Sequence, residues 1–307
     1  MHERDDEAAE ARLGTIAGVV AYGLWGVFPL VFHRLGDVNP LEILFHRVLW
    51  SFLVVVVLVR ATKQGRALRA VFRDGHRLRL LAAAGALVAT NWLVYIWAVN
   101  RERVVDAALG YYINPLITVA LGVVVLHEHL RRAQKVAIAF GAAAVAVLTA
   151  AYGSVPWIAL VLAVTFGAYG FAKKSVGVPA TISLAVETTV LLPIAVIGLT
   201  IMEATGDAAF GHGSGGRTAL LASLGVVTAV PLLLFGAAAG RIPLSLLGLL
   251  QYLTPTLQLI CGVVVLHEEL PPERLAGFVL VWIALIVLGV DALRAPRPVL
   301  SSVENAG

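Results

Sequence analysis

Two charged residues lie deep inside apolar stretches of the sequence, where they could contact a charged ligand or bind an ion. Arg47, next to His46, lies about 10 Å into its stretch at a rise of about 1.5 Å per residue, and Glu187 is the deepest carboxylate. A charge at such a depth costs about 2.5 to 3.5 kcal/mol on insertion scales, so each should face inward and hold a partner. The alternatives are snorkelling of Arg47 toward the surface beside Trp50, and a purely structural ion pair or hydrogen bond at Glu187.

Glu42 lies four residues before His46 in the same stretch. The segment Asn39-Pro40-Leu41-Glu42 has an Asn cap, Pro at the first helical position and Glu three residues after the cap, which is the pattern of a capping box. We therefore interpret Glu42 as a structural cap in preference to a direct contact with a substrate.

Aromatic residues and amides with polar atoms gather on a few of the apolar stretches. Hydrocarbon offers their polar atoms no partner, so they should point inward, either to line a cavity or to hydrogen-bond between helices. We expect a cavity for a small-molecule substrate to be lined by Tyr22, Trp25, His46, Arg47, Asn91, Tyr95, Tyr112, Asn114, Glu187, Gln251 and Tyr252.

Signals for enzyme chemistry are sparse. His127 and His129 flank Glu128, but histidines two residues apart on a helix point to different faces, so we do not interpret the segment as a metal site. No Gly-rich phosphate loop with Lys-Ser/Thr occurs. We expect no catalytic residues, metal or cofactor in this chain.

The elements that must position these residues are membrane-spanning helices. Of the 307 residues 59% are hydrophobic and 14% are charged, against about 25% charged in an ordinary soluble domain. The apolar residues form stretches close to the roughly 20 residues that cross about 30 Å of hydrocarbon. The sequence predicts ten spans, near 15–34, 39–59, 79–100, 104–126, 133–151, 156–173, 179–200, 218–239, 243–266 and 274–293.

The basic residues predict the orientation. Seven of the 23 Lys and Arg lie in Arg60–Arg79, a short loop between two spans, so the net charge of +4 gives no argument for nucleic acid as a partner. Membrane lipids are the expected surroundings. With both termini inside, the cytoplasmic side carries 17 Lys and Arg and the outer side 5. Because basic residues concentrate in cytoplasmic loops, we predict that both termini are cytoplasmic.

An internal repeat divides the chain. Gly122–Glu128 recurs letter for letter as Gly262–Glu268, and at that offset of 140 eleven of the 22 positions from 109 to 130 are identical. Each copy would hold five spans, an odd number, so the second copy must enter the membrane from the opposite face. We predict an all-α membrane protein of ten transmembrane helices in two inverted five-helix halves, 1–152 and 153–295, followed by a polar cytoplasmic tail, 296–307.

The inverted halves make Arg47 and Glu187 residues of equivalent spans, the second and the seventh. Their depths leave roughly 8 Å between them along the membrane normal, so we predict one electrostatic network bridged by long side chains, a water or a substrate group. We also expect a central cavity lined by the third, fourth, eighth and ninth spans, which Asn91, Tyr95, Asn114 and Tyr252 should face.

Six segments, in order over nearly all of the spans, resemble the RarD group of the EamA-type branch of the drug/metabolite transporter superfamily. One departure is Tyr112, where Phe is usual in that group; the tyrosine adds a hydroxyl. The six segments are Ala21–Pro29, Glu42–Ser51, Asn91–Asn100, Leu109–Leu116, Glu187–Pro193 and Gln251–Leu257.

The resemblance implies a ten-helix inverted-repeat carrier of the bacterial cytoplasmic membrane, described as a permease or exporter of small metabolites or drugs. The group is linked by name to chloramphenicol sensitivity. The resemblance supplies neither a substrate nor catalytic residues.

Our main hypothesis is a secondary transporter of small metabolites or drug-like molecules that works by alternating access. The alternative is an intramembrane enzyme acting on a lipid-linked substrate, which should cluster a nucleophile, a base or metal ligands near one face. The polar residues are instead dispersed over many spans, which favours a transport pathway. The pairs Gly14/Gly18 and Gly236/Gly240 permit either close packing within the chain or a homodimer.

Overall fold

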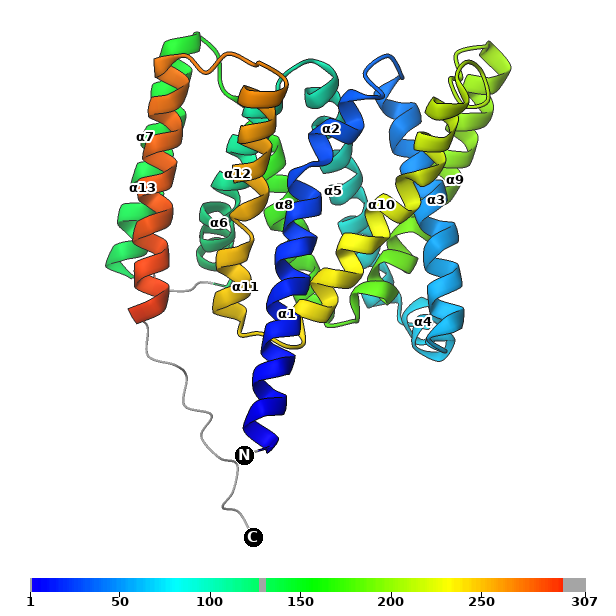
Figure 1. Cartoon of the computed structure of the whole chain (residues 1–307), viewed down its shortest axis with the longest axis horizontal. Coiled ribbons are helices and arrows are strands. Elements are labelled where there is room, and N and C mark those ends of the chain that lie inside the picture. The colour runs from blue at the N-terminus through cyan, green and yellow to red at the C-terminus, as the bar shows by residue number, and fades with distance from the viewer. Residues whose placement is uncertain (1, 127–130, 295–307) are drawn as a thin grey trace.

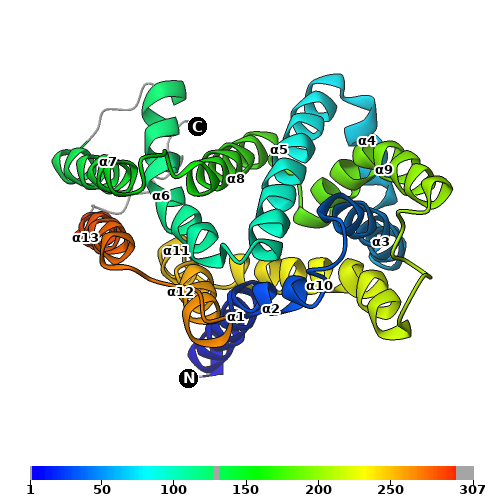
Figure 2. The same ribbon diagram turned by 90° about the horizontal axis from the view of Figure 1, so that it is seen from above.

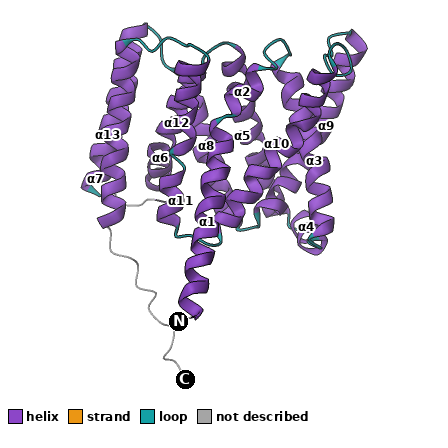
Figure 3. Cartoon of the chain, viewed as in Figure 1, coloured by secondary structure: helices purple, strands orange, loops and turns teal. Residues whose placement is uncertain are grey.

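The protein is helical throughout the part of the chain that the structure describes. The structure is a computed structural model that describes residues 2–126 and 131–294, and over these residues Figure 3 shows helices and loops without a strand. The helices are α1 (His2–Gly26), α2 (Phe28–His33), α3 (Pro40–Ala61), α4 (Gly65–Arg73), α5 (Gly75–Asn100), α6 (Val104–Leu126), α7 (Arg132–Tyr152), α8 (Trp157–Val176), α9 (Ala180–Thr205), α10 (Gly215–Ala239), α11 (Leu244–Leu250), α12 (Leu253–Ile260), the π-helix η1 (Cys261–Val265) and α13 (Pro272–Arg294).

Nine candidate membrane spans lie within the described residues, and each coincides with a predicted apolar stretch. The remaining prediction, 156–173, corresponds to α8, whose apolar part Trp157–Lys173 is shorter than the others. Nine spans are therefore shown by length and composition. The predicted tail, 296–307, lies outside the described residues.

Several helix ends follow directly from the sequence. The side chains of Asn39, Asp74 and Ser214 each accept hydrogen bonds from backbone N–H groups in the first turn of α3, α5 and α10. These hydrogen bonds lower the pKa of the Asp74 carboxyl below its ordinary value. Gly153 and Gly177 follow α7 and α8 in the left-handed conformation, which glycine adopts without steric cost.

The two predicted halves are interleaved. α3 packs against α9 and α10, α8 packs against α5 and α6, α1 packs against α10 and α12, and α7 packs against α13. Viewed from above, α3 and α9 lie at one end of the molecule and α7 and α13 at the other (Figure 2). The beginning of α1, the short helix α4 and the end of α13 lie on the same side, at the bottom of Figure 1.

The ninth predicted span, 243–266, is not one regular helix. It comprises α11, α12 and η1, with a break at Gln251 and Tyr252. Its counterpart in the repeat, α6, is continuous from Val104 to Leu126 with Pro115 inside it. The first span is also interrupted, at Val27 between α1 and α2, next to Pro29. A proline removes a backbone donor, which accounts for an interruption near Pro29.

Gly14 and Gly18 pack closely against other helices and loops of the same chain. A Cβ atom added to Gly14 would lie 2.5 Å from the Cβ of Arg241, and one added to Gly18 would lie 2.8 Å from Cδ1 of Leu250. A Cβ added to Gly236 would meet nothing within 4 Å among the described residues. The homodimer stays a prediction, and Gly14 and Gly18 are not available for its interface.

The predicted orientation can be tested by cysteine labelling. In a Cys261→Ala background, we expect a membrane-impermeant maleimide to label His212→Cys, in an exposed loop, on intact cells. It should label Ala67→Cys, exposed on α4, only after the membrane is permeabilised. Labelling of Ala67→Cys on intact cells, with His212→Cys protected, would reverse the orientation.

Candidate functional site

Arg47 lies inside the bundle, with 4% of its surface exposed. Its Nε donates a hydrogen bond of 3.0 Å to Oγ1 of Thr228 on α10. The guanidinium carbon lies 3.8 Å from the centre of the Trp92 ring, and the rings of Phe28 and Phe32 are 5.7 and 5.6 Å away. Arg47 therefore does not snorkel to the surface; cation–π contacts surround it instead.

Glu187 has its own partners, on α8 and α9. The hydroxyl groups of Ser183 and Tyr169 donate to its carboxylate, the latter at 3.1 Å, and Nζ of Lys173 lies 3.5 Å from Oε1. Lys173, near the end of α8, is thus an ion-pair partner of Glu187. Over the described residues no hydrogen bond or ion pair joins Arg47 to Glu187. Tyr169 lies within electrostatic range of both.

Glu42 is fully buried and holds a loop in place. Its carboxylate accepts hydrogen bonds from the backbone N–H groups of Ala209 and Phe210, at 2.8 to 3.0 Å. Asn39 caps α3 as predicted, by accepting from the N–H of Leu41. The predicted capping box is wrong in its second half, because Glu42 binds the loop before α10 instead of the N-terminus of its own helix. Glu42 thus has a structural contact, but a different one from the predicted cap.

His46 belongs to the same end of α3. Its Nδ1 accepts a hydrogen bond of 3.2 Å from Nε1 of Trp50, and its ring centre lies 4.5 Å from that of Phe210. Nε2 lies 3.8 Å from Oε1 of Glu42. These side chains border a hollow of about 500 Å³ between α3 and α9, which Glu203 also lines.

The amide of Asn91 joins three helices. Its Nδ2 donates to the carbonyl of Leu162 and to Oγ1 of Thr165 on α8, and its Oδ1 accepts from the hydroxyl of Tyr111 on α6, each at 3.0 Å. These contacts agree with the second alternative given for the polar side chains, a hydrogen bond between helices. Tyr95 is 3% exposed, and its hydroxyl has no hydrogen-bond partner in the described part of the chain.

Four further candidates lie on α6 and at the break in the ninth span. The hydroxyl of Tyr112 is 2.6 Å from Oγ1 of Thr256, and this hydrogen bond ties α6 to α12. Oδ1 of Asn114 is buried without a hydrogen-bond partner among the described residues. Gln251 and Tyr252 are half-buried between α11 and α12, and Tyr252 packs against a core cluster that α6 and α13 share.

Tyr22 and Trp25 form an aromatic group with Phe235 of α10, with ring centres 5.5 to 6.0 Å apart. Their backbone carbonyls accept hydrogen bonds from side chains of α12, Thr254 and Gln258. Of the predicted site residues, Arg47, Asn91 and Tyr95 are linked through the rings of Phe32 and Tyr111, whereas Tyr22 with Trp25 and Tyr112 with Thr256 have other partners. The single central cavity stays a prediction.

Sequence reasoning missed the contacts of Glu268. Its carboxylate, just beyond η1, accepts hydrogen bonds from the backbone N–H groups of Val104 and Val105, at 2.6 and 2.9 Å. Burial raises the pKa of the Glu268 carboxyl above its ordinary value, although the two N–H groups lower it. Arg274 lies 3.7 Å from Asp106 in the same region. The repeated segment that ends in Glu268 was the available signal.

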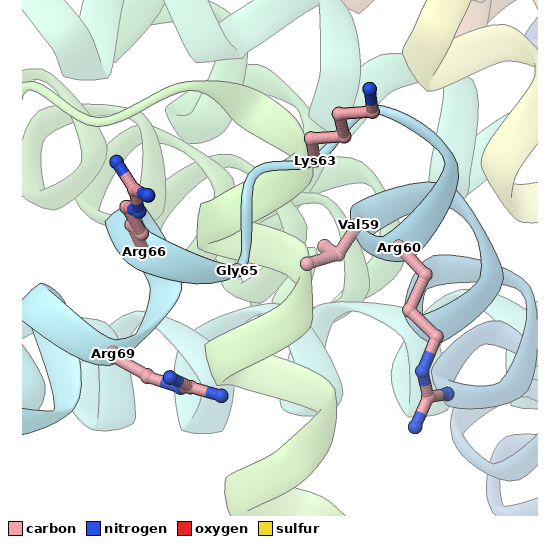
Figure 4. A pocket seen from close by; sticks show the side chains of 6 residues that line it. All are labelled: Val59, Arg60, Lys63, Gly65, Arg66 and Arg69. Carbon is pink, nitrogen blue, oxygen red and sulfur yellow. The ribbon is translucent and has the colours of Figure 1, made fainter.

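A second hollow, of about 320 Å³, lies beside α4 and is bordered by Arg60, Lys63, Arg66 and Arg69. Figure 4 shows that these basic side chains point in different directions and do not converge on one point. That arrangement is typical of a basic loop at a membrane surface, where lipid headgroups are the expected neighbours.

No three residues among His, Cys, Asp and Glu come together as a metal-binding group in residues 2–126 and 131–294. The segment His127–His129 lies outside the described residues. The single cysteine, Cys261, is buried at the start of η1.

Comparison with known proteins places these features in a family. Residues 12–150 match the model of the EamA-like transporter family. A protein named RarD from Streptomyces exfoliatus is 46% identical over 97% of this chain and 94% of its own length. An uncharacterized transporter of Pseudomonas aeruginosa is 42% identical over 94% of this chain and 97% of its own.

The fold is also found among solved structures. One crystal structure matches with a TM-score of 0.60 and 19% identity, over 92% of this chain and 99% of its own. Such low identity speaks for the fold alone. The family match and the relatives show that this chain is a multi-pass membrane protein of the EamA-like transporter family and belongs to its RarD group.

Proposed function

We propose that the protein is a secondary transporter that carries small metabolites or drug-like molecules across the bacterial cytoplasmic membrane by alternating access. In this proposal α8 completes a set of ten spans, and the chain consists of two inverted halves with both termini cytoplasmic. The family and a relative named as a transporter support transport in preference to an intramembrane enzyme.

The observation that carries the proposal is that one repeated sequence has two backbone conformations. Gly122–Leu126 continues the α-helix α6, whereas Gly262–Val265 belongs to the π-helix η1, after which the helix ends at Leu266. The letters within the segment are identical, so they do not by themselves decide between the two conformations. Two inverted halves that exchange these conformations would open the bundle to each side in turn.

The contacts of Glu268 support an inverted arrangement. The residue follows η1 at the end of the ninth span, yet it binds the beginning of α6, the fourth span. The helices α6 and α12 therefore run in opposite directions side by side, as Figure 1 also shows for α6 and α11–α12. In the proposed orientation this end is the outer one, so Glu268 holds the two halves together and closes the outer side.

Loosening this contact should open the outer side. In a Cys261→Ala background we use Val105→Cys, at a position that is fully buried below Glu268, as the reporter. Hydrogen bonds to a charged group contribute about 1.5 to 3 kcal/mol, so Glu268→Gln should shift the equilibrium between closed and open states at least about tenfold. We expect a corresponding rise in the rate at which an impermeant maleimide labels the reporter from outside.

The matched control is Glu269→Gln, because the Glu269 side chain is exposed and removal of its charge leaves Val104 and Val105 untouched. It should leave the labelling rate unchanged. An equal rate in the Glu268→Gln and wild-type backgrounds would contradict the assignment of Glu268 as a closure.

A further inference from the structure

Arg47 is a buried cation without an acidic partner in the described part of the chain. Other buried or half-buried charges have opposite charges or backbone donors around them: Glu187 pairs with Lys173, Asp106 with Arg103, and Glu42 with two N–H groups. Arg47 has one hydrogen bond, to the neutral hydroxyl of Thr228. An uncompensated charge at this depth is unfavourable, so its persistence calls for a counter-charge from elsewhere.

The surroundings of Arg47 leave its hydrogen-bonding edge free. A guanidinium carries five N–H donors in one plane, and stacking on an aromatic ring occupies the face of that plane. Trp92 takes the face at 3.8 Å, and Thr228 takes Nε. Neither Nη1 nor Nη2 of Arg47 has a hydrogen bond to any residue that the structure describes. These two groups form the fork that binds a carboxylate or phosphate by two parallel hydrogen bonds.

A second unsatisfied polar group lies in the same aromatic environment. The ring of Tyr95 is 5.9 Å from that of Phe32, which in turn lies 5.6 Å from the Arg47 guanidinium. The Tyr95 hydroxyl is buried without a partner among the described residues. A hydroxyl can donate one further hydrogen bond to an anion, and the rings of Phe28, Phe32 and Trp92 offer faces to a flat apolar body.

We propose that the substrate is an organic anion with a flat apolar body, and that the Arg47 guanidinium binds its negative charge. This inference rests on the proposed transport function, because it assigns the substrate class of that transporter. The substrate supplies the counter-charge that the chain lacks, and the ring of Trp92 keeps the guanidinium in place while the site is empty.

Three flat molecules of nearly equal shape test the charge preference: benzoate, benzamide and benzamidine, which are anionic, neutral and cationic. Binding to the purified protein in detergent is measured by thermal stabilisation, because a ligand that binds only the folded state raises its stability by mass action. We expect benzoate to stabilise the protein in a saturable way, and benzamide and benzamidine to leave its stability unchanged. Arg47→Met should weaken benzoate binding about 10- to 100-fold, the loss expected for hydrogen bonds to a charged group.

Arg101→Met is the matched control. Arg101 also lies over a tryptophan, with its guanidinium carbon 5.9 Å from the ring of Trp97, but it is exposed. Its removal should leave benzoate binding unchanged. Arg47→Lys keeps the charge and loses the fork, so it should retain binding that is weaker than wild type and stronger than Arg47→Met.

Stability without ligand separates a binding role from a structural one. Because Arg47 has no acidic partner, Arg47→Met should be at least as thermally stable as wild type when no ligand is present. A large loss of ligand-free stability would make Arg47 a packing residue and overturn the proposal. Equal binding of benzoate by wild type and Arg47→Met, no benzoate binding, or preferential binding of benzamidine would also overturn it.

Flux into reconstituted vesicles distinguishes the two proposals. Benzoate flux that Arg47→Met abolishes supports both. If benzamide or benzamidine crosses the membrane and benzoate does not, the result supports transport but overturns the anionic substrate class. Binding of benzoate through Arg47 without flux of any of the three molecules supports the anion site and contradicts transport.

Discussion

Replacing Glu187 by Gln is expected to destabilise the folded protein by about 3 kcal/mol, because it leaves Lys173 without its counter-charge inside the bundle. Breaking a buried ion pair on one side costs about 3 to 5 kcal/mol, and we take the lower end because the Lys173 side chain is 20% exposed. The double change Glu187→Gln with Lys173→Met should recover part of the loss. The free energy of unfolding of each variant is measured on the detergent-solubilised protein.

The control cycle pairs Glu187→Gln with Arg47→Met. The two residues share no hydrogen bond or ion pair in the described residues, so their effects should be nearly additive, within about 0.5 kcal/mol. The sequence had predicted strong coupling between them through one network. If the interaction free energy between Glu187 and Arg47 exceeded that between Glu187 and Lys173, a single network that includes Arg47 and Glu187 would be the better explanation. Tyr169 would then connect the two residues.

The helices of this protein could be predicted closely from the sequence. Apolar length decides which segments cross lipid, so hydropathy alone placed the candidate spans, and local capping residues such as Asn39 and Ser214 mark two of their beginnings. The repeat also marks α6 and α12 as matching parts of the two predicted halves, and in the structure these two helices pack against each other.

The partners of the buried charges could not be predicted in the same way. A spanning helix that is apolar on nearly every face gives little indication of its rotation about its own axis, so the direction in which Glu187 points on α9 was open. Depth along the membrane normal suggested Arg47 as its partner. The packing of α9 beside α8 instead brings Tyr169 and Lys173 to the carboxylate.

The same limit applies to Glu42 and Glu268. A glutamate near a helix end has the same local pattern whether it caps its own helix or binds a distant loop, and here both bind backbone N–H groups far away in sequence. The break at Gln251–Tyr252 and the π-helix η1 have a continuous helix as their counterpart in the repeat, although Pro115 in α6 matches Pro255 in α12. Identical letters in Gly122–Leu126 form a regular helix.

Gly225 should be the least replaceable glycine on α10. A Cβ atom there would clash with the backbone carbonyl of Trp50 on α3, and its distance to the carbonyl carbon would be 2.5 Å. Backbone atoms cannot rotate away as a side chain can, so α3 and α10 would have to move apart. The contact lies one turn from the hydrogen bond between Arg47 and Thr228, which that movement would break as well.

We therefore expect Gly225→Ala to destabilise the protein by about 3 kcal/mol, the upper end of the usual cost of overpacking. Gly236→Ala is the matched control on the same helix, because a Cβ there meets nothing within 4 Å among the described residues. It should gain up to about 1 kcal/mol, since alanine favours a helix more than glycine does. Thermal unfolding in detergent measures both. Equal unfolding temperatures for the two variants would mean that α3 and α10 are not held in contact at Gly225, and that the Arg47–Thr228 hydrogen bond does not depend on that contact.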